Sequence, residues 1–545
     1  MTHKKAFLKI ISRALRSLLP CTLLAPFSPL SAQVTEYQGQ TSGGAYYSIA
    51  LPAQWQPADG LVIWNHGYQG YTSSEPDSNP SLGPLEDVIL SQGYAMAASS
   101  YRQTGWAVFD SHEDNLELYE KFVELAAVPD RLFLQGASLG GIVSVRDLEA
   151  SLLPEIDGAL LMCGAVAGAK NWYEAYDLRM VYEAVCNDVS KAELPTASWS
   201  EEPDRIRGEL DFLDSLQRCT GLSTTGLIGG RLGELFQSDA QKERLEKILR
   251  LTNTHQDFLL LNLGYAVFEI PRLVNDEGKL AGARPFGNLG IDYGDDEVNM
   301  RAPRSIALPS ATRRFLANYS PSGSVRNSKI VSIHTSQDGL VKVENQQTLR
   351  QLVAPELLTQ AIVVEEKPSH CGFTNDEGIA AWNSLVDWVD GGQQPGPEML
   401  QSKCLLTAAS AADCRFDPDF VWQPQLLTFP REASGIAAGT SFYDSANATV
   451  LIDRMSVLGG DQDYRLTLAA PNDAGGLFTI ERADSLPSTS EPVPEYRASY
   501  SPSDQILFIP DLSILPLSAG ARRYDVYMRY LEEAGNTGLE LLEIE

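Results

Sequence analysis

Short apolar runs alternate with helical stretches through the first third of the chain. The apolar runs lie at residues 61–64, 94–98, 132–134 and 158–164. Helical stretches lie between and after them, most clearly at residues 115–127 and 140–153. Continuous apolar runs are typical of strands that are buried on both faces. The alternation therefore predicts a parallel sheet that is covered on both faces by helices.

The alternation stops near residue 167, and the stretch that follows is mostly helical and rich in aromatic residues. One of its helical candidates, residues 238–251, begins with Ser238 and Gln241, which match the pattern of a capping box. Another candidate is residues 173–185. The sheet pattern then resumes, with two strands and a closing helix at residues 329–334, 361–364 and 380–389. The helical region is therefore expected to be an insertion into one domain.

The last part of the chain has a different character. From about residue 426 onward, short stretches of alternating apolar and polar residues are separated by turn residues, which predicts antiparallel strands. The predicted fold class is α/β, with a mainly parallel sheet, a helical cap insertion and a small C-terminal antiparallel β domain. The expected boundaries are 1–32 for a signal peptide, 33–166 and 321–395 for the two parts of the core, 167–320 for the insertion, 396–425 for a linker and 426–545 for a β-sandwich-like module.

Charge narrows the choice of partners. The 545 residues carry a formal net charge of −29, so the protein would repel nucleic acids and anionic membrane surfaces. We expect no nucleic-acid partner.

The N-terminus has the pattern of a secretory signal. Basic residues extend to Arg16, an apolar stretch follows at residues 18–27, and residues 30–32 suit a cleavage site. The apolar stretch is too short to span a bilayer and is interrupted by Pro20 and Pro26. We therefore expect a secreted or periplasmic protein without stable membrane insertion.

Six cysteines remain after the predicted leader, and an even number in an exported chain indicates disulfides. Cys404 and Cys414 are the pair that proximity favours. Cys186 with Cys219 would join two parts of the insertion, which would leave Cys163 and Cys371 as the third pair. Since none of these cysteines has zinc-finger spacing, we expect no metal centre, and nothing in the chain indicates another cofactor.

One strand leads directly into a Gly-x-Ser-x-Gly turn, in which residues 132–137 are followed by Ser138 and a helix start. A strand that runs straight into a helix forces a sharp turn, and small neighbours let the backbone pass through it. Such a turn lifts Ser138 above the sheet, where its hydroxyl can attack a carbonyl carbon. Ser138 is therefore the candidate nucleophile.

A serine hydroxyl needs a base, and the mature chain contains only five histidines. His370 is the one that follows a late strand, at the expected mouth of the sheet. Asp338 follows the preceding strand, where a carboxylate that orients the histidine belongs. Asp376 is a reserve candidate, although it comes after His370.

Attack on a carbonyl builds negative charge on oxygen, which backbone N–H groups must stabilise. The N–H of Leu139, directly after the serine, is one candidate donor. Tyr68, within the sequence His-Gly-Tyr-Gln-Gly, is the other. Candidate residues for the substrate pocket are Tyr101, Arg102, Trp106 and Trp172.

Together these motifs resemble the α/β-hydrolase superfamily. The sequences HGYQG, GASLG, SQDG and SHCGF occur in the chain order Ser, Asp, His that marks this fold. The resemblance covers residues 46–166 and 329–391, and it implies that the insertion acts as a cap. It also implies Ser138 as nucleophile, His370 as base and Asp338 as its orienting acid. In tannase-type and feruloyl-type esterases a cysteine typically stands beside the serine and another after the histidine. Here Cys371 follows His370, but Ala137 precedes Ser138.

The leading hypothesis is an exported serine hydrolase that cleaves small-molecule or polymeric carboxylic esters through an acyl-enzyme. The first alternative is a serine peptidase on the same fold, with a preference for proline as one form of it. The second is a non-catalytic protein that binds a surface or a polymer through the C-terminal β module. The oligomeric state stays open.

Overall fold

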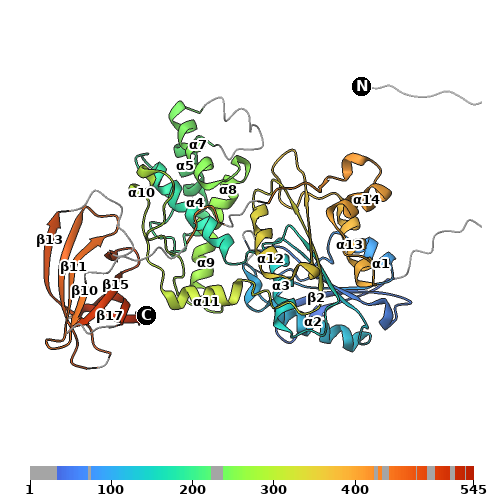
Figure 1. Ribbon diagram of the computed structural model, residues 1–545, viewed down its shortest axis with the longest axis horizontal. Helices are drawn as coiled ribbons and strands as arrows, with labels where there is room; N and C mark the ends of the chain where they lie inside the picture. The colour runs from blue at the N-terminus through green and yellow to red at the C-terminus, as the bar shows by residue number, and fades with distance from the viewer. Residues whose placement is uncertain are drawn as a thin grey trace, which may run out of the picture.

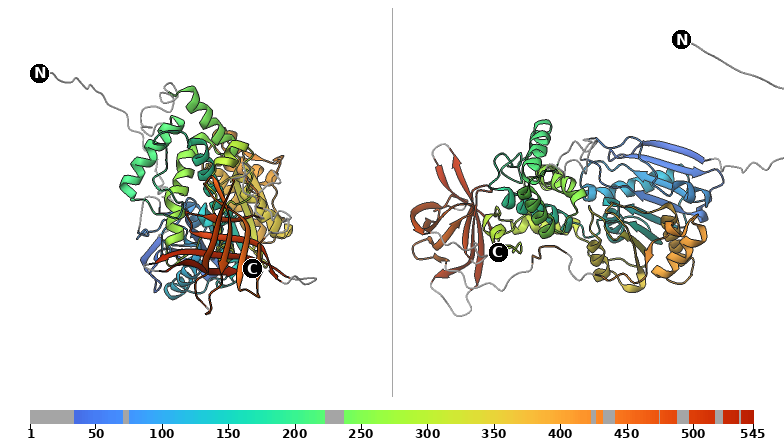
Figure 2. Two further views of the ribbon diagram at one scale, coloured as in Figure 1. Left: turned by 90° about the vertical axis from the view of Figure 1, so that its left-hand side faces the viewer. Right: turned by 90° about the horizontal axis from the view of Figure 1, so that it is seen from above.

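The computed structural model describes residues 34–70, 75–222, 237–422, 427–431, 441–473, 475–487, 497–515, 522–533 and 536–545. The predicted signal peptide, residues 1–32, lies outside the described residues. Figures 1 and 2 show a helical region that lies between an α/β core and a C-terminal β-sheet. No described helix combines the length and the apolar character that a membrane span requires.

The core is built on a sheet of nine strands, in the order β1-β2-β4-β3-β5-β6-β7-β8-β9. The strands are β1 Val34–Gln40, β2 Tyr46–Pro52, β3 Leu61–Asn65, β4 Ala95–Ser99, β5 Leu132–Ala137, β6 Gly158–Met162, β7 Lys329–Thr335, β8 Leu358–Val363 and β9 Phe416–Asp417. Strands β3 to β8 pair in parallel, and β1, β2 and β9 are antiparallel additions. The predicted mainly parallel sheet is confirmed, and the apolar runs of the sequence form its central strands.

Helices cover both faces of this sheet (Figure 1). They are α1 Glu86–Ser91, α2 Ser111–Leu125, α3 Leu139–Ala150, α12 Gln346–Leu352, α13 Asn375–Val389 and α14 Pro397–Thr407. Residues of α2 and α3, such as Phe122 and Ile142, pack with one set of strand side chains. Residues of α1 and α13, such as Ile89 and Trp382, pack with the other set. Strand side chains that alternate between the two faces thus give the core two apolar layers.

The insertion lies between β6 and β7 and is helical, as expected. Its helices are α4 Lys170–Cys186, α5 Arg205–Thr220, α7 Asp239–Thr252, α8 Gln256–Gly264, the π-helix η3 Tyr265–Glu269, α9 Ile270–Asn275, α10 Asp296–Arg301 and α11 Pro309–Tyr319. The predicted capping box forms, because Ser238 and Gln241 bond reciprocally at the start of α7. A disulfide between Cys186 and Cys219 joins α4 to α5.

The linker predicted at residues 396–425 is wrong for its first part. Helix α14 begins at Pro397, and β9 pairs antiparallel with β8, so the core sheet continues to Asp417. The Pro- and Gly-rich sequence before it indicated a linker, but proline is also favoured in the first turn of a helix. The disulfide between Cys404 and Cys414 closes this segment as proximity predicted.

The C-terminal strands form one hydrogen-bonded sheet that is mainly antiparallel. They are β10 Ser441–Asp444, β11 Thr449–Val457, β12 Gln462–Ala469, β13 Thr479–Pro487, β14 Ala498–Ser501, β15 Ile506–Leu515, β16 Arg523–Glu533 and β17 Asn536–Ile544. Two of the pairings, β10 with β15 and β11 with β14, are parallel. The sheet contacts the insertion, where Asp504 binds Arg284 at 3.2 Å and Glu543 binds Arg313 at 2.8 Å (Figure 2).

A buried ion pair holds the segment that leads to this sheet against the insertion. Arg431 donates two hydrogen bonds of 2.8 Å to the carboxylate of Asp177 in α4. The guanidinium also lies over the ring of Tyr173, 4.3 Å from its centroid. Burial raises the pKa of Asp177, and the charge of Arg431 opposes that rise.

We predict that Arg431→Met destabilises the protein by about 3–5 kcal/mol, because it leaves a buried carboxylate without its cation. The measurement is the midpoint of urea or thermal unfolding. The double variant D177N/R431M should recover much of the loss, since it removes the uncompensated charge. An unchanged midpoint in R431M would show that the pair does not hold the two parts together.

Candidate active site

Ser138 lies in the sharp turn that the sequence predicted. Strand β5 ends at Ala137, α3 begins at Leu139, and Ser138 between them has φ 55° and ψ −121°. Two glycines make this turn possible. A Cβ on Gly140 would lie 1.8 Å from the carbonyl oxygen of Asn65, and one on Gly136 would lie 2.1 Å from the carbonyl oxygen of Gly140. The helix can therefore approach β3 and β5 closely only with glycine at both positions.

The structure brings Ser138, His370 and Asp338 together. The Nε2 atom of His370 lies 2.9 Å from the Oγ atom of Ser138. The Nδ1 atom of the same ring lies 2.9 Å and 3.0 Å from the two carboxylate oxygens of Asp338. The three side chains come from loops after β5, β8 and β7, which all end at the same edge of the sheet. The hydroxyl, imidazole and carboxylate thus form a continuous chain of hydrogen bonds.

Asp338 is held as a charged acceptor. Burial alone would raise its pKa, but hydrogen bonds and nearby positive charge, from His370 above all, hold the pKa below its ordinary value. Its Oδ1 atom also accepts hydrogen bonds from the N–H groups of Leu340 and Val341, at 2.9 Å and 2.8 Å. Because a carboxylate only accepts, Nδ1 of His370 must carry a proton, which leaves Nε2 free to accept the hydroxyl proton of Ser138.

The other candidates for base and acid do not complete this chain of hydrogen bonds. His334 is buried within β7, and its ring nitrogens bond to the carbonyl of Val341 and the amide of Gln346. His66 stacks on Tyr101, with ring centroids 4.2 Å apart. Asp376, the reserve acid, stands in the first turn of α13. Of the described histidines, His370 is the one that bonds to Ser138.

The predicted oxyanion donors flank the serine. Leu139 is the first residue of α3, so its N–H belongs to the free N-terminal end of that helix. On the other side, a Cβ on Gly67 would lie 3.4 Å from Cβ of Ser138, which places the loop of Gly67 and Tyr68 directly against the nucleophile. The two backbone segments therefore lie on either side of Ser138, and the role of their N–H groups stays a prediction.

The insertion holds this loop through side chains that sequence reasoning did not single out. The hydroxyl of Tyr68 donates a hydrogen bond to Glu269 of the π-helix. Burial, with the charge of Glu269, raises the pKa of Tyr68 well above its ordinary value, so its hydroxyl remains a donor. Arg272 donates a 2.9 Å hydrogen bond to the carbonyl of Gly70. The loop thus takes its position from the insertion as well as from the core.

The remaining cysteine pair also belongs to the site. Cys163, directly after β6, forms a disulfide with Cys371, the neighbour of His370. All three cysteine pairs considered from the sequence therefore form. Three disulfides indicate that the protein folds in an oxidising compartment. Cys163, His370 and Cys371 are close enough to suggest a metal site, but both sulfurs are used in the disulfide.

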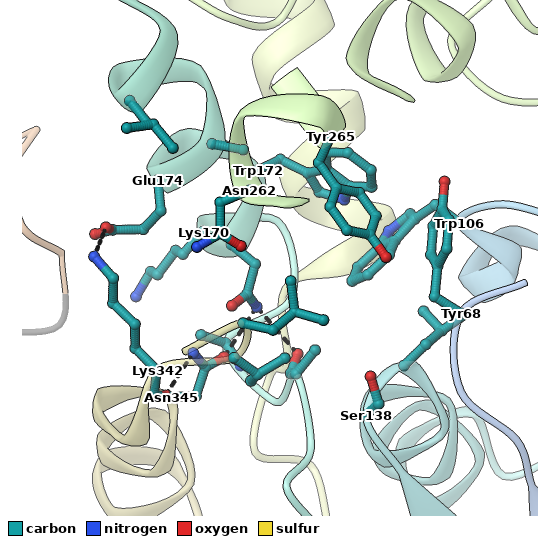
Figure 3. A pocket seen from close by; sticks show the side chains of 18 of the residues that line it. Tyr68, Trp106, Ser138, Lys170, Trp172, Glu174, Asn262, Tyr265, Lys342 and Asn345 are labelled. Atoms are coloured by element: carbon teal, nitrogen blue, oxygen red, sulfur yellow. Dashed lines mark hydrogen bonds and ion pairs between the residues drawn. The ribbon is translucent and has the colours of Figure 1, made fainter. Parts of the chain in front are cut away.

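A pocket of about 900 Å³, open solvent at its mouth included, extends from Ser138 into the insertion. Figure 3 shows aromatic side chains near the serine and charged and amide side chains toward the far end. The aromatic lining consists of Tyr68, Trp106, Trp172 and Tyr265. The polar lining includes Lys170, Glu174, Asn262, Lys342 and Asn345.

Trp106 and Trp172 line the pocket as predicted, whereas Tyr101 and Arg102 do not. Tyr101 is buried against His66. Arg102 is paired with Asp114 of α2, at 2.7 Å. Both residues follow the end of β4, where a pocket was expected, but the chain turns them toward α2 and the core. The polar residues at the far end of the pocket carried no sequence signal, because they come from the insertion and from the segment after β7, which only the folded chain brings together.

Comparisons with known proteins are distant. No protein-family model matches the chain, and neither does any curated protein. Among solved structures, puromycin hydrolase is 13% identical, with a TM-score of 0.34, over 66% of this chain and 40% of its own. Candida antarctica lipase A is 12% identical, with a TM-score of 0.33, over 70% of this chain and 88% of its own. An esterase from Pyrococcus furiosus is 15% identical, with a TM-score of 0.31, over 68% of this chain and 96% of its own. The chain thus spans less than half of the puromycin hydrolase.

A buried polar cluster lies beneath the serine turn. The carboxylate of Asp147 in α3 accepts hydrogen bonds from Asn115, at 2.7 Å, and from Asn65, at 3.3 Å. Asn65 is the last residue of β3, and its carbonyl is the one that Gly140 lies against. Burial raises the pKa of Asp147 from 3.8 to about 7, although both amide donors oppose the rise.

This shift predicts a pH-dependent stability. Because the pKa is higher in the folded protein, the contribution of protonated Asp147 is complete below about pH 4 and is lost as the pH rises to about 7. Asp147→Asn cannot ionise, so wild-type stability should fall relative to this variant by up to about 4 kcal/mol between pH 4 and pH 8. Urea unfolding at several pH values measures the difference. D130N, at an exposed position, is the control, and parallel pH profiles for wild type and D147N would contradict the prediction.

Proposed function

We propose that this protein, which has the α/β-hydrolase fold, is an exported serine hydrolase that cleaves carboxylic esters. The fold follows from the strand order of the core sheet and from the serine turn between β5 and α3. The observation that carries the function is the hydrogen-bonded chain of Ser138, His370 and Asp338 at one edge of a substrate-sized pocket. The predicted signal peptide and the three disulfides support export.

The reaction follows from this geometry. Nε2 of His370 takes the hydroxyl proton while Oγ of Ser138 attacks the ester carbonyl carbon, and Asp338 stabilises the imidazolium. The negative oxygen of the tetrahedral intermediate is met by the N–H groups of Leu139 and Tyr68, each worth roughly 3–4 kcal/mol of barrier. His370 then gives its proton to the leaving alkoxide, which leaves Ser138 acylated. A water molecule, activated by the same imidazole, releases the acid and restores the serine.

The pocket favours an ester with a bulky apolar part next to the scissile bond. Trp106, Trp172 and Tyr265 lie around the space in front of Ser138 (Figure 3). Aromatic faces of this kind bind apolar and aromatic groups through large contact areas. The same triad would also cleave an amide, so the preference for esters is tested together with the mechanism.

We predict that Ser138→Ala lowers kcat/KM for 4-nitrophenyl butyrate at least about 1000-fold, since the nucleophile is lost while the fold is kept. Release of nitrophenolate measures turnover, and the thermal midpoint reports folding. Ser91→Ala, at an exposed serine in α1, is the matched control and should retain wild-type turnover.

A fluorophosphonate separates catalysis from binding alone. Wild type should gain the mass of one adduct, mapped to Ser138, and S138A should gain none. Absence of the adduct in folded wild type would instead favour a non-catalytic binding protein. Faster cleavage of peptide anilides than of nitrophenyl esters would favour a peptidase.

A further inference from the structure

The far end of the pocket holds three charged side chains, and two of them neutralise each other. Lys342 and Glu174 form an ion pair of 2.5 Å. The ammonium of Lys342 also donates to the carbonyl of Thr252, at 2.9 Å, and to the hydroxyl of Thr428, at 3.0 Å. Three acceptors therefore use all three of its protons.

The carboxylate of Glu174 likewise has several hydrogen-bond donors around it. Besides Lys342, its carboxylate accepts hydrogen bonds from the N–H of Thr428, at 2.6 Å, and from the hydroxyl of Thr428, at 2.9 Å. This pair closes the far wall of the pocket and contributes no net charge to it.

Lys170 is the third charged residue of the lining, and it has no such partner. It is the first residue of α4 and its side chain is half-buried. Among the described residues, no carboxylate lies within ion-pair distance of its ammonium, and no side chain or carbonyl accepts a hydrogen bond from it. Burial lowers its pKa from the ordinary value. Since none of the described residues accepts from this ammonium, Lys170 can donate hydrogen bonds to an anionic group of a ligand in the pocket that it lines.

The surroundings of Lys170 favour an anion further. The first three N–H groups of α4 bond to the carbonyls of the preceding turn, so this helix of 17 residues contributes the positive end of its dipole and no free donors. Figure 3 shows Lys170 on the side of the pocket where Glu174 and Lys342 lie, away from Ser138, with Trp172 and Tyr265 also lining the space. The pocket thus has a nucleophile near one end, aromatic walls and one uncompensated positive charge toward the other.

We propose that Lys170 binds a carboxylate of the substrate, so that the protein selects esters that carry a free carboxylate remote from the scissile bond. The inference rests on the proposed function of the same site and adds a substrate class to it. A single ammonium suits a monoanion. Polyanions are disfavoured, because the protein as a whole carries a net charge of −29.

Two series of esters test this proposal. The first consists of mono(4-nitrophenyl) esters of linear dicarboxylic acids with four to ten carbons. The second consists of the same nitrophenyl esters with the free carboxylate converted to a neutral methyl ester. Binding is measured by calorimetry in the S138A background, where no turnover is needed. We expect at least one anionic ester to bind tenfold or more tightly than its methyl counterpart, and salt to reduce the difference.

The lysine is tested by substitution in the same background. K170M and K170Q should each reduce the preference for the anionic ester to less than about twofold, whereas K170R should keep most of it. K242M, at an exposed lysine of α7, is the matched control and should leave the preference unchanged. Thermal midpoints confirm that each variant is folded.

The outcomes separate the two proposals. Equal binding of anionic and neutral esters at every chain length, or an unchanged preference in both K170M and K170Q, would overturn the role of Lys170, whatever the turnover of wild type. Tight, Lys170-dependent binding of the anionic ester without any turnover by wild type would support the carboxylate site and overturn the hydrolase.

Discussion

The site depends on how closely the backbone of α3 approaches the strands beneath it. Gly140 lies so near the carbonyl of Asn65 that no other residue fits without moving a strand. This approach sets the sharp turn at Ser138, whose positive φ is unfavourable for a residue with a side chain and persists because the surroundings enforce it. The polar cluster of Asn65, Asn115 and Asp147 holds the same strand end from below. The contact between Gly140 and Asn65 thereby places Ser138, the start of α3 and the adjacent loop.

The insertion positions residues beside Ser138 as well as covering them. Glu269 and Arg272 bind the loop that carries Tyr68, through its hydroxyl and through the carbonyl of Gly70. The π-helix that presents Glu269 is a rare local geometry, and such bulges occur often at functional sites. Lys170, from the same insertion, supplies the positive charge of the pocket. An insertion that moved would therefore change both the loop of Tyr68 and the pocket.

The sequence predicted what depends on local pattern. Apolar runs predicted β3 to β8, and the loops that follow three of these strands predicted Ser138, Asp338 and His370, which the fold brings together. Local pattern did not predict the pocket. Tyr101 follows a strand end but turns into the core, whereas Lys170 reaches the pocket through long-range packing that leaves no periodic signal. Strand ends predicted that Ser138, Asp338 and His370 lie close together because parallel strands share one edge, and that argument does not extend to the insertion.

The disulfide between Cys163 and Cys371 holds the loop of His370 without placing a cysteine next to Ser138. Ala137 pairs with Met162 at the end of β6, and Cys163 is the next residue along the chain, so the disulfide starts after β6 and not from the residue beside Ser138. From there it binds Cys371 and ties the loop of His370 to the core. The backbone of Ser369, on the other side of His370, accepts a hydrogen bond of 3.1 Å from the N–H of Gly339. The loop of His370 is thus fixed on both sides of the imidazole, while the turn keeps the small residue Ala137 before Ser138, so the ring is held in place without crowding the serine hydroxyl.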